Sequence, residues 1–233
     1  TNNPFKKLYY KIESRKLKNF DKLVHHADLL CTISGNDYEY YSSLHKNVMN
    51  LPVFHGQHLF HSKSKGDYAL YHGNLKISEN EYAALYLINQ IFKELNYSLI
   101  IAGRNPGRKL KRTIKSHPNV SLQENIKKED LNDLIANANI HIFPVFISAG
   151  IKLKLIHVLN SSGHIITTPK MITDNNIADL CNVGKSIKDI KKLILEKAEQ
   201  PLEKNEIAKR QKMLWVNYSN EKNIKMLVSR IFN

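Results

Sequence analysis

Apolar side chains near the start of the chain recur at helical spacing. Between residues 5 and 25 they stand three to five positions apart, as on an amphipathic helix with a basic outer face. A short apolar run follows at 28–34, and Asn36 with Glu39 resembles a capping box before a tyrosine-rich stretch. These patterns predict a helix, then a strand, then a second helix.

From about residue 67 the pattern changes to strand-like runs that alternate with helix-like runs. The strand-like runs are ALYHG (69–73), SLIIAG (98–103), NVSLQ (119–123), NIHIFP (139–144) and HIITT (164–168), and the helix-like runs are 79–95, 107–116, 129–138 and 150–160. Such alternation is typical of parallel strands joined by right-handed helical crossovers. We therefore predict an α/β fold with a doubly wound parallel sheet.

The periodicity is lost at 51–67, where Gly, Ser, Pro and Lys gather as in a connection between units. We predict a partial N-terminal unit and linker at 1–60, a Rossmann-like domain at 61–200, and C-terminal helices at 201–233 that pack back toward the N-terminal unit. The helical patterns near the end lie at 186–199 and 203–232. The chain begins with Thr1 and not with Met, and we expect N-terminal sequence to be missing.

Composition excludes several classes of protein. Hydrophobic residues make up 42% and charged residues 24%, which is typical of globular chains and not of disordered or collagen-like ones. No apolar run approaches the ~20 residues that cross a bilayer, and no signal sequence is visible, so we expect a cytoplasmic protein. The two cysteines, Cys31 and Cys181, lie in apolar stretches, cannot build a disulfide framework, and are expected to be buried.

The formal net charge of +14 favours an anionic partner. Basic residues cluster at 6–22 and 104–115, without the interleaved aromatic residues of a nucleic-acid platform, so we expect no nucleic-acid partner. Each cluster is interpreted either as a solvated face or as a surface for phosphorylated ligands or anionic lipid. For the helix at 5–25, the alternatives are contact with an anionic membrane and packing on the rest of an N-terminal domain.

Ligands of parallel sheets bind outside the carboxyl ends of the strands. The loops at these ends are HGNL (72–75), AGRNPGRK (102–109), QENI (123–126) and PVFISAGIKLK (144–154). In the last loop, Ser148 and Gly150 allow a ligand to approach the backbone at a helix start, where the helix dipole favours phosphate, and Lys152 and Lys154 add two cations. Because Gly150, Lys154 and His157 share one helical face, the pattern indicates a clamp for phosphate and ribose.

Three groups of residues resemble one known family. YHGNL (71–75) with SENEYAA (78–84), IAGRNP (101–106), and ANIHIFP (138–144) with SAGIKLKLIHVLNSSGHIITT (148–168) are similar to the motifs of family 4 retaining glycosyltransferases of GT-B fold, also called glycosyl transferases group 1. The resemblance extends from about residue 20 to 200. It implies that 61–200 is the nucleotide-sugar-binding C-terminal domain of a GT-B enzyme, with the acceptor-side domain represented at most by residues 1–55.

The resemblance implies that the protein transfers a sugar from a nucleoside-diphosphate sugar to a glycan or lipid-linked acceptor. The transfer would be of hexosyl type, with retention of configuration. We expect this in cell-surface polysaccharide or glycolipid synthesis, with no cofactor and no metal ion. The protein would be cytoplasmic, with a peripheral position at the inner face of the membrane as an alternative. His55, His58 and His61 are spaced by three, but Pro52 and Gly56 oppose the helix that a metal site there would need.

The donor-binding residues are carried over from the family's motifs. The backbone at Gly73 and Asn74 would face the pyrophosphate, Glu124 and Asn125 would lie near the base, and Arg104 would stand at the rim. Lys152 or Lys154 would pair with phosphate, beside the loop of Ser148 and Gly150. No catalytic residue is assigned.

One position departs from the family, because His157 stands where the family has a glutamate that accepts hydrogen bonds from the ribose hydroxyls. A neutral imidazole has one acceptor nitrogen, whereas a carboxylate can accept from both hydroxyls. His157 is therefore interpreted as a ribose ligand, as a structural histidine, or as the mark of lost catalysis. Two other hypotheses for function follow: a non-catalytic homologue that binds a sugar nucleotide or a glycan, and a basic module that binds polyanions.

Overall fold

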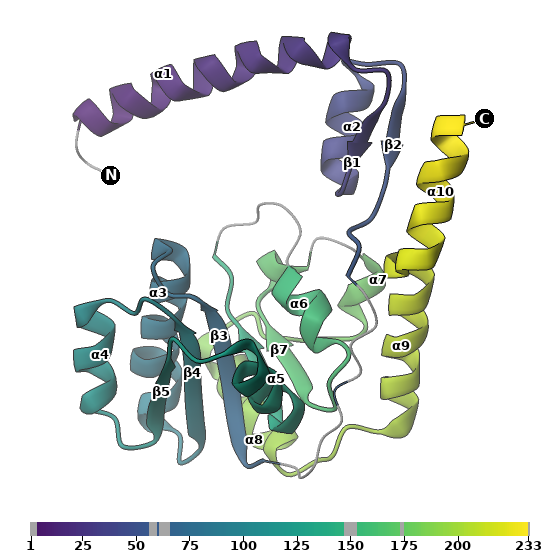
Figure 1. Cartoon of the computed structure of the whole chain (residues 1–233). Helices are drawn as coiled ribbons and strands as arrows, with labels where there is room; N and C mark the ends of the chain where they lie inside the picture. The colour runs from purple at the N-terminus through teal and green to yellow at the C-terminus, as the bar shows by residue number, and fades with distance from the viewer. Residues whose placement is uncertain (1–3, 56–59, 61–65, 147–152, 173–174, 233) are drawn as a thin grey trace. The chain divides into compact units, whose positions relative to one another are not determined.

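The computed structural model of the chain (Figure 1) describes residues 4–55, 60, 66–146, 153–172 and 175–232. The chain divides into two compact units. One consists of Thr1–Phe54 with Asn220–Asn233, and the other of His55–Ser219.

The smaller unit is built on a two-stranded parallel sheet. Its elements are α1 (Pro4–Phe20), a 3-10 helix (Asp21–His26), β1 (Leu30–Thr32), α2 (Gly35–Ser42), β2 (Val48–Asn50) and α10 (Asn220–Phe232). The C-terminal helix α10 is tied to this unit because Asn223 Nδ2 donates to the Pro52 carbonyl at 2.9 Å and Arg230 Nη2 donates to Asn47 Oδ1. The predicted helix, strand and helix at the start of the chain are confirmed.

Two local expectations for this unit were wrong. The N-cap of α2 is Ser34 and not Asn36, because Ser34 has an extended backbone and its Oγ accepts from the Asp37 amide at 3.1 Å. Cys31 is exposed. It alternates along β1 with buried Thr32, so the two side chains point to opposite faces.

The larger unit contains a six-stranded parallel sheet with helices on both faces (Figure 1). In spatial order its strands are β5 (Val120–Glu124), β4 (Ser98–Arg104), β3 (Tyr68–Asn74), β6 (Ile140–Phe143), β7 (His164–Thr167) and β8 (Asn182–Val183). The order reverses between β3 and β6, which confirms the predicted doubly wound α/β fold. The short strand β8 was not predicted.

The helices of this unit follow the predicted pattern closely. They are α3 (Ser78–Tyr86), which continues through a π-helical turn (Leu87–Ile91) and a 3-10 turn (Phe92–Glu94), α4 (Arg108–Lys115), α5 (Lys128–Asn137), α6 (Leu153–Val158), a 3-10 helix (Pro169–Met171), α7 (Asn175–Ala178), α8 (Ile187–Ala198) and α9 (Lys204–Tyr218). The helix expected at 203–232 is two helices, α9 and α10. Ser219 separates them with an extended backbone.

The core lies between the sheet and its helices. Every residue of β6 and β7 is buried, as expected of strands covered on both faces. The buried side chain of Arg210 attaches α9 to the sheet by donating to the carbonyl of Gly163 at 2.8 Å and of Leu180 at 3.3 Å. Gly163 itself has no room for a side chain, because a Cβ there would lie 2.5 Å from the Ala138 carbonyl oxygen.

None of the helices that the structure describes is both long and apolar enough to cross a lipid bilayer.

Candidate functional site

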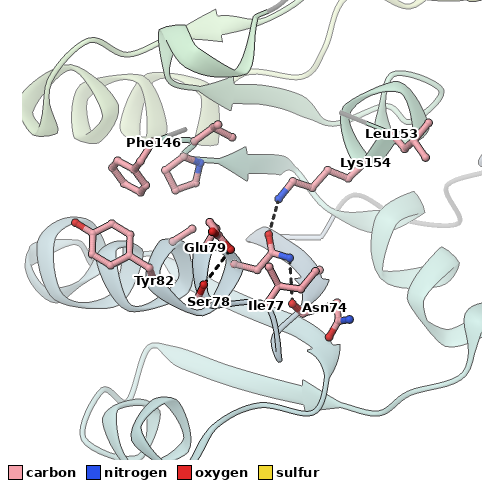
Figure 2. Close-up of a pocket in the computed structure, with 13 residues that line it drawn as sticks. Asn74, Ile77, Ser78, Glu79, Tyr82, Phe146, Leu153 and Lys154 are labelled. Atoms are coloured by element: carbon pink, nitrogen blue, oxygen red, sulfur yellow. Dashed lines mark hydrogen bonds between the residues drawn. The ribbon is translucent and has the colours of Figure 1, made fainter. Parts of the chain in front are cut away.

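A pocket of the larger unit lies where the strand order reverses. From β3 the chain passes through α3 toward β4, whereas from β6 it passes through α6 toward β7, so the two connections diverge and leave a crevice at the carboxyl edge of the sheet. A cavity of about 1090 Å³ occupies this place (Figure 2). Its described lining consists of Gly73, Asn74, Ile77, Ser78, Glu79, Asn80, Tyr82 and Ala83 after β3, Pro144, Val145 and Phe146 after β6, and Leu153 and Lys154 of α6.

A hydrogen-bonded network holds a lysine at one end of this pocket. Lys154 Nζ donates to Asn80 Oδ1 at 3.3 Å, and Asn80 Nδ2 donates to the Asn74 carbonyl at 3.0 Å. The same ammonium lies 5.2 Å from the ring centroid of Tyr71 and 5.4 Å from that of Phe143, within the range of cation–π attraction. Figure 2 shows Lys154 extending into the pocket from α6. The network fixes a positive charge beside the loop that follows β3.

Glycines bring the strand ends close together at this edge. Gly73 pairs in register with Gly103, and Asn74 with Arg104. A Cβ on Gly103 would overlap the Gly73 carbonyl oxygen, so only glycine fits there. The backbones of β3 and β4 therefore approach each other closely at this edge of the sheet.

Two histidines of the sheet, His72 and His141, are buried. Burial, together with the smaller effect of the nearby Lys154 and His157, lowers the pKa of His72 to about 3. His72 Nε2 has no hydrogen-bond partner among the described residues. Burial also holds the pKa of His141 well below its usual range, and His141 Nε2 lies 2.7 Å from Ser161 Oγ. Both rings are thus neutral at physiological pH.

His157 is half-buried near the end of α6. Its ring makes edge contacts with Phe60 at 5.0 Å and with His55 at 5.5 Å between centroids. His157 and Lys154 both lie on α6, three residues apart. The phosphate-and-ribose clamp stays a prediction.

The residues predicted near the base lie at the ends of the neighbouring strands. Glu124 ends β5 and pairs with Lys111 of α4 at 2.5 Å. Asn125 follows with a positive φ of 56°, and Asn105 after β4 has a φ of 54°. Asn125 Oδ1 accepts from the Asn105 amide at 3.0 Å, which joins the two loops. Left-handed non-glycine residues of this kind gather at ligand sites.

The pocket therefore contains some of the predicted donor-binding residues and not others. Among the described residues, Gly73, Asn74 and Lys154 line it, whereas Arg104, Glu124 and Asn125 lie one or two strands away at the same edge of the sheet. His157 is not among the described lining residues. Ser148, Gly150 and Lys152 lie outside the described residues.

Two features of the pocket were missed by the sequence analysis. Asn80 is the asparagine of SENEYAA, so the family pattern carried a signal for it. The aromatic wall formed by Tyr82, Tyr86 and Phe146, with centroid distances of 4.9 and 5.0 Å to Phe146, had no such signal because helix and loop meet only in the fold. Figure 2 shows Tyr82 and Phe146 side by side.

Within the described parts of the chain, no group of three or more His, Cys, Asp or Glu residues could hold a metal ion. His58 and His61 lie outside those parts, so the predicted absence of a metal site at 55–61 stays a prediction.

Solved structures of the same fold are glycosyltransferases and related synthases. A mutant of S. aureus TarM in complex with Fondaparinux, alpha-GlcNAc-glycerol and UDP is 12% identical with a TM-score of 0.72, over 94% of this chain and 47% of that one. Sucrose-phosphate synthase from Thermosynechococcus elongatus is 12% identical with a TM-score of 0.67, over 94% of this chain and 62% of that one.

A third structure is WaaG, a glycosyltransferase involved in lipopolysaccharide biosynthesis. It is 16% identical with a TM-score of 0.51, over 72% of this chain and 47% of that one. The chain thus spans about half of TarM and WaaG and under two thirds of the sucrose-phosphate synthase. No curated protein sequence matches the chain.

The family assignment rests on the match to a family model. Residues 66–195, more than half of the chain, match the family described as glycosyl transferases group 1. This segment covers β3 to β8 and both sides of the pocket. With the GT-B fold shared by the solved structures, the match establishes that the chain belongs to the glycosyl transferases group 1 family.

Proposed function

We propose that the chain binds a nucleoside-diphosphate sugar at the carboxyl edge of the six-stranded sheet, in a protein that transfers the sugar to a glycan or lipid-linked acceptor. The observation that carries the proposal is the lysine network. In a chain of this family, Lys154 is held by Asn80 at the point where the strand order reverses, which is where α/β sheets bind their ligands.

Lys154 would supply the positive charge that pairs with the diphosphate of the donor. An ammonium group that is already oriented stabilises the charge that develops on the leaving diphosphate, without the cost of ordering the side chain at that moment. The backbone of Gly73 and Asn74 would pass along the same phosphates. Since lysine supplies this charge, donor binding is proposed to need neither a metal ion nor a separate cofactor.

The nucleoside would extend along the same edge of the sheet. Glu124 and Asn125 are proposed near the base and Arg104 at the rim, because these strand ends follow β3 in the sheet. His157 would contact the ribose through a nitrogen of its imidazole ring. Transfer with retention of configuration, of hexosyl type, is the family's expectation for this arrangement.

His157 favours a second candidate function, a non-catalytic homologue that binds a sugar nucleotide or a glycan. Its ring already packs edge-on against Phe60 and His55, which is also what a structural histidine does. In this candidate, donor binding is retained and transfer is lost. The two functions therefore differ in turnover and not in binding.

The cellular role is proposed to be synthesis of a cell-surface polysaccharide or glycolipid, by a cytoplasmic protein at the inner face of the membrane. WaaG, which shares the fold, is involved in lipopolysaccharide biosynthesis, and this supports the proposal. Contact with anionic lipid is proposed through α1, where Phe5 is 81% and Phe20 is 68% exposed among basic residues. Co-sedimentation with phosphatidylglycerol vesicles, and not with phosphatidylcholine vesicles, is the expected result. Equal sedimentation with both, or with neither, would contradict membrane contact.

The experiment that tests the proposed function combines binding with turnover. The protein is melted in UDP, GDP and ADP at equal concentrations, where a nucleotide that binds the folded state raises the melting temperature, and more so the tighter it binds. It is then incubated with the matching nucleotide sugars, with water as the acceptor of the sugar, while release of the nucleoside diphosphate and the anomeric signal of the freed sugar are followed by NMR. One preferred base with release of a retained anomer supports a transferase, and binding without release supports the non-catalytic homologue.

Two outcomes would contradict the proposed function. A folded protein that none of the three nucleotides stabilises has no donor site. Stabilisation that ignores the base and disappears at high salt would instead favour the basic polyanion-binding module.

A further inference from the structure

A buried chain of hydrogen bonds joins the end of α6 to strand β6. His141 Nε2 lies 2.7 Å from Ser161 Oγ, and Ser161 Oγ donates to the Val158 carbonyl at 2.7 Å. The Ser161 amide donates to the same carbonyl at 2.9 Å. Val158 is the last residue of α6, so Ser161 satisfies a carbonyl that the helix itself leaves unpaired. Both His141 and Ser161 are buried.

The hydroxyl proton of Ser161 decides which nitrogen of His141 carries a hydrogen. A serine hydroxyl has one proton, and here it is donated to the Val158 carbonyl, which can only accept. In the contact with His141, Nε2–H therefore donates and Ser161 Oγ accepts. Because burial holds the pKa of His141 well below its usual range, the ring is neutral and Nδ1 carries no proton. Nδ1 has no hydrogen-bond partner among the described residues.

The packing of β6 does not require a histidine at this place. The other residues of the strand are Ile140, Ile142 and Phe143, which are apolar. A buried polar atom without a partner lowers stability, whereas a leucine at position 141 would leave no such atom. Polar groups that lower the stability of a core in this way are expected beside functional sites. The position of His141 relative to the pocket therefore needs to be considered.

Strand β6 contacts α6 at both ends of the helix. His141 and Phe143 are two residues apart on the strand, so they point to the same face of the sheet. The Phe143 ring lies 5.4 Å from Lys154 Nζ, and His141 holds Ser161 just beyond the other end of α6. Two residues of a strand span about 6.6 Å, and the four steps from Lys154 to Val158 span about 6 Å of helix. The two contacts thus match in spacing.

The contact at Ser161 fixes how far α6 lies along β6, and this sets where Lys154 stands at the carboxyl edge. With six residues, α6 is too short to be a stable helix without its contacts. Asn80 orients the ammonium group of Lys154 but belongs to α3 and does not hold α6 against the sheet.

We propose that His141 is a positioning residue for donor binding: through Ser161 it holds α6 at the place along β6 from which Lys154 reaches the diphosphate. This inference rests on the proposed function, since it adds a residue to that same site.

The test is calorimetric titration of the full chain with UDP, GDP and ADP. His141→Leu removes the donor to Ser161, and Ser161→Ala removes the acceptor. His141→Gln is the conservative variant, because its amide nitrogen can donate from the place of Nε2. Asn139→Ala is the matched control. Asn139 is also buried, and its amide donates to Tyr97 Oη at 3.2 Å and to the Ala198 carbonyl at 2.9 Å, neither of which belongs to α6.

We expect His141→Leu and Ser161→Ala to lose roughly threefold to tenfold in affinity for the nucleoside diphosphate that the native chain binds best, because Lys154 must be placed again when phosphate binds. His141→Gln and Asn139→Ala should stay within about twofold, since the first keeps the donor and the second leaves α6 unchanged. In a Lys154→Met background, His141→Leu should lower affinity by less than about twofold, because the lysine that it positions is absent.

Four results would overturn the inference. They are native affinity in His141→Leu, an equal loss in Asn139→Ala, no recovery in His141→Gln, and an undiminished effect of His141→Leu in the Lys154→Met background. Urea unfolding shows whether each variant is folded, and if His141→Leu is not, Ser161→Ala decides by its own affinity, against Asn139→Ala and in the Lys154→Met background. When the native chain binds a nucleotide and residues 141 and 161 do not affect it, only the inference fails. When the folded native chain binds none of the three nucleotides, the proposed function fails.

Discussion

Replacing Asn80 should show whether the hydrogen bond that orients Lys154 contributes to diphosphate affinity, or whether the positive charge of Lys154 is sufficient by itself. Its side chain is half-buried, accepts from Lys154 Nζ at 3.3 Å and donates to the Asn74 carbonyl at 3.0 Å. Asn80→Ala removes both hydrogen bonds and leaves the charge of Lys154 unchanged. Asn80→Asp keeps the shape of the side chain but places a carboxylate against the ammonium.

The magnitudes follow from these contacts. Each hydrogen bond contributes a net ~0.5–1.5 kcal/mol, so Asn80→Ala, which removes two, should lower the free energy of unfolding by about 1–3 kcal/mol. A freed lysine must be ordered again when phosphate binds, at a cost of about 0.5–1.5 kcal/mol, so diphosphate affinity should fall roughly threefold to tenfold. Asn80→Asp should weaken binding further, by more than about tenfold, because its carboxylate competes for Lys154 and repels phosphate.

The assay is calorimetric titration with the preferred nucleoside diphosphate, beside urea unfolding of each variant. Asn89→Ala is the matched control. Asn89 lies farther along the same helical segment, is not among the residues that line the pocket, and donates a side-chain hydrogen bond to the Leu85 carbonyl at 2.9 Å. The reasoning is refuted if Asn80→Asp binds as tightly as the native protein, or if Asn89→Ala weakens binding as much as Asn80→Ala.

Three further predictions concern single residues. His157→Glu should tighten diphosphate binding several-fold in calorimetric titration if the histidine has replaced a glutamate that bound the ribose better. It should weaken binding if the histidine itself binds the ribose of this protein's donor. An unchanged affinity would show that residue 157 does not touch the ligand. Gly103→Ala should lower the free energy of unfolding, measured in urea, by roughly 2–4 kcal/mol, because its Cβ would overlap the Gly73 carbonyl oxygen. Gly35→Ala is the control, since no atom lies within 4 Å of its Cβ position, and it should change the free energy of unfolding by less than about 1 kcal/mol. Equal effects of the two substitutions would contradict this packing. Because burial lowers the pKa of His72 from 6.5 to about 3, the unfolded chain takes up a proton between these values and the folded chain does not, so stability is complete above pH 6.5 and falls below it by about 1.4 kcal/mol per pH unit for this group. His72→Leu should reduce that slope, and an unchanged slope would indicate that His72 is not buried as the structure has it.

The sheet could be predicted from the sequence because its central strands are buried on both faces. SLIIAG and NIHIFP are continuous apolar runs for that reason, and the intervening helices show their own period. β8 was missed because two residues, Asn182 and Val183, are too few to show a period. The break at Ser219 was missed because the helical pattern continues on both sides of it.

The site was only partly predictable, for a physical reason. Lys154 and Gly73 could be found because loops at the carboxyl ends of parallel strands meet at one edge. Asn80 lies on a helix, and only the fold shows that its amide joins Lys154 to the loop after β3. The burial of His72 depends on the packing of β3, β6 and α6, which no local pattern reports.

The central claim is that Lys154 binds the diphosphate of a nucleotide donor. The most direct measurement is calorimetric titration with UDP, GDP and ADP of the native chain, of Lys154→Met, and of Lys76→Met, which removes an exposed charge two residues after Asn74. We predict one saturable site with a preferred base, at least about a tenfold loss of affinity in Lys154→Met, and less than about a twofold loss in Lys76→Met. Equal losses in the two variants, or no saturable binding by a folded native chain, would contradict the claim.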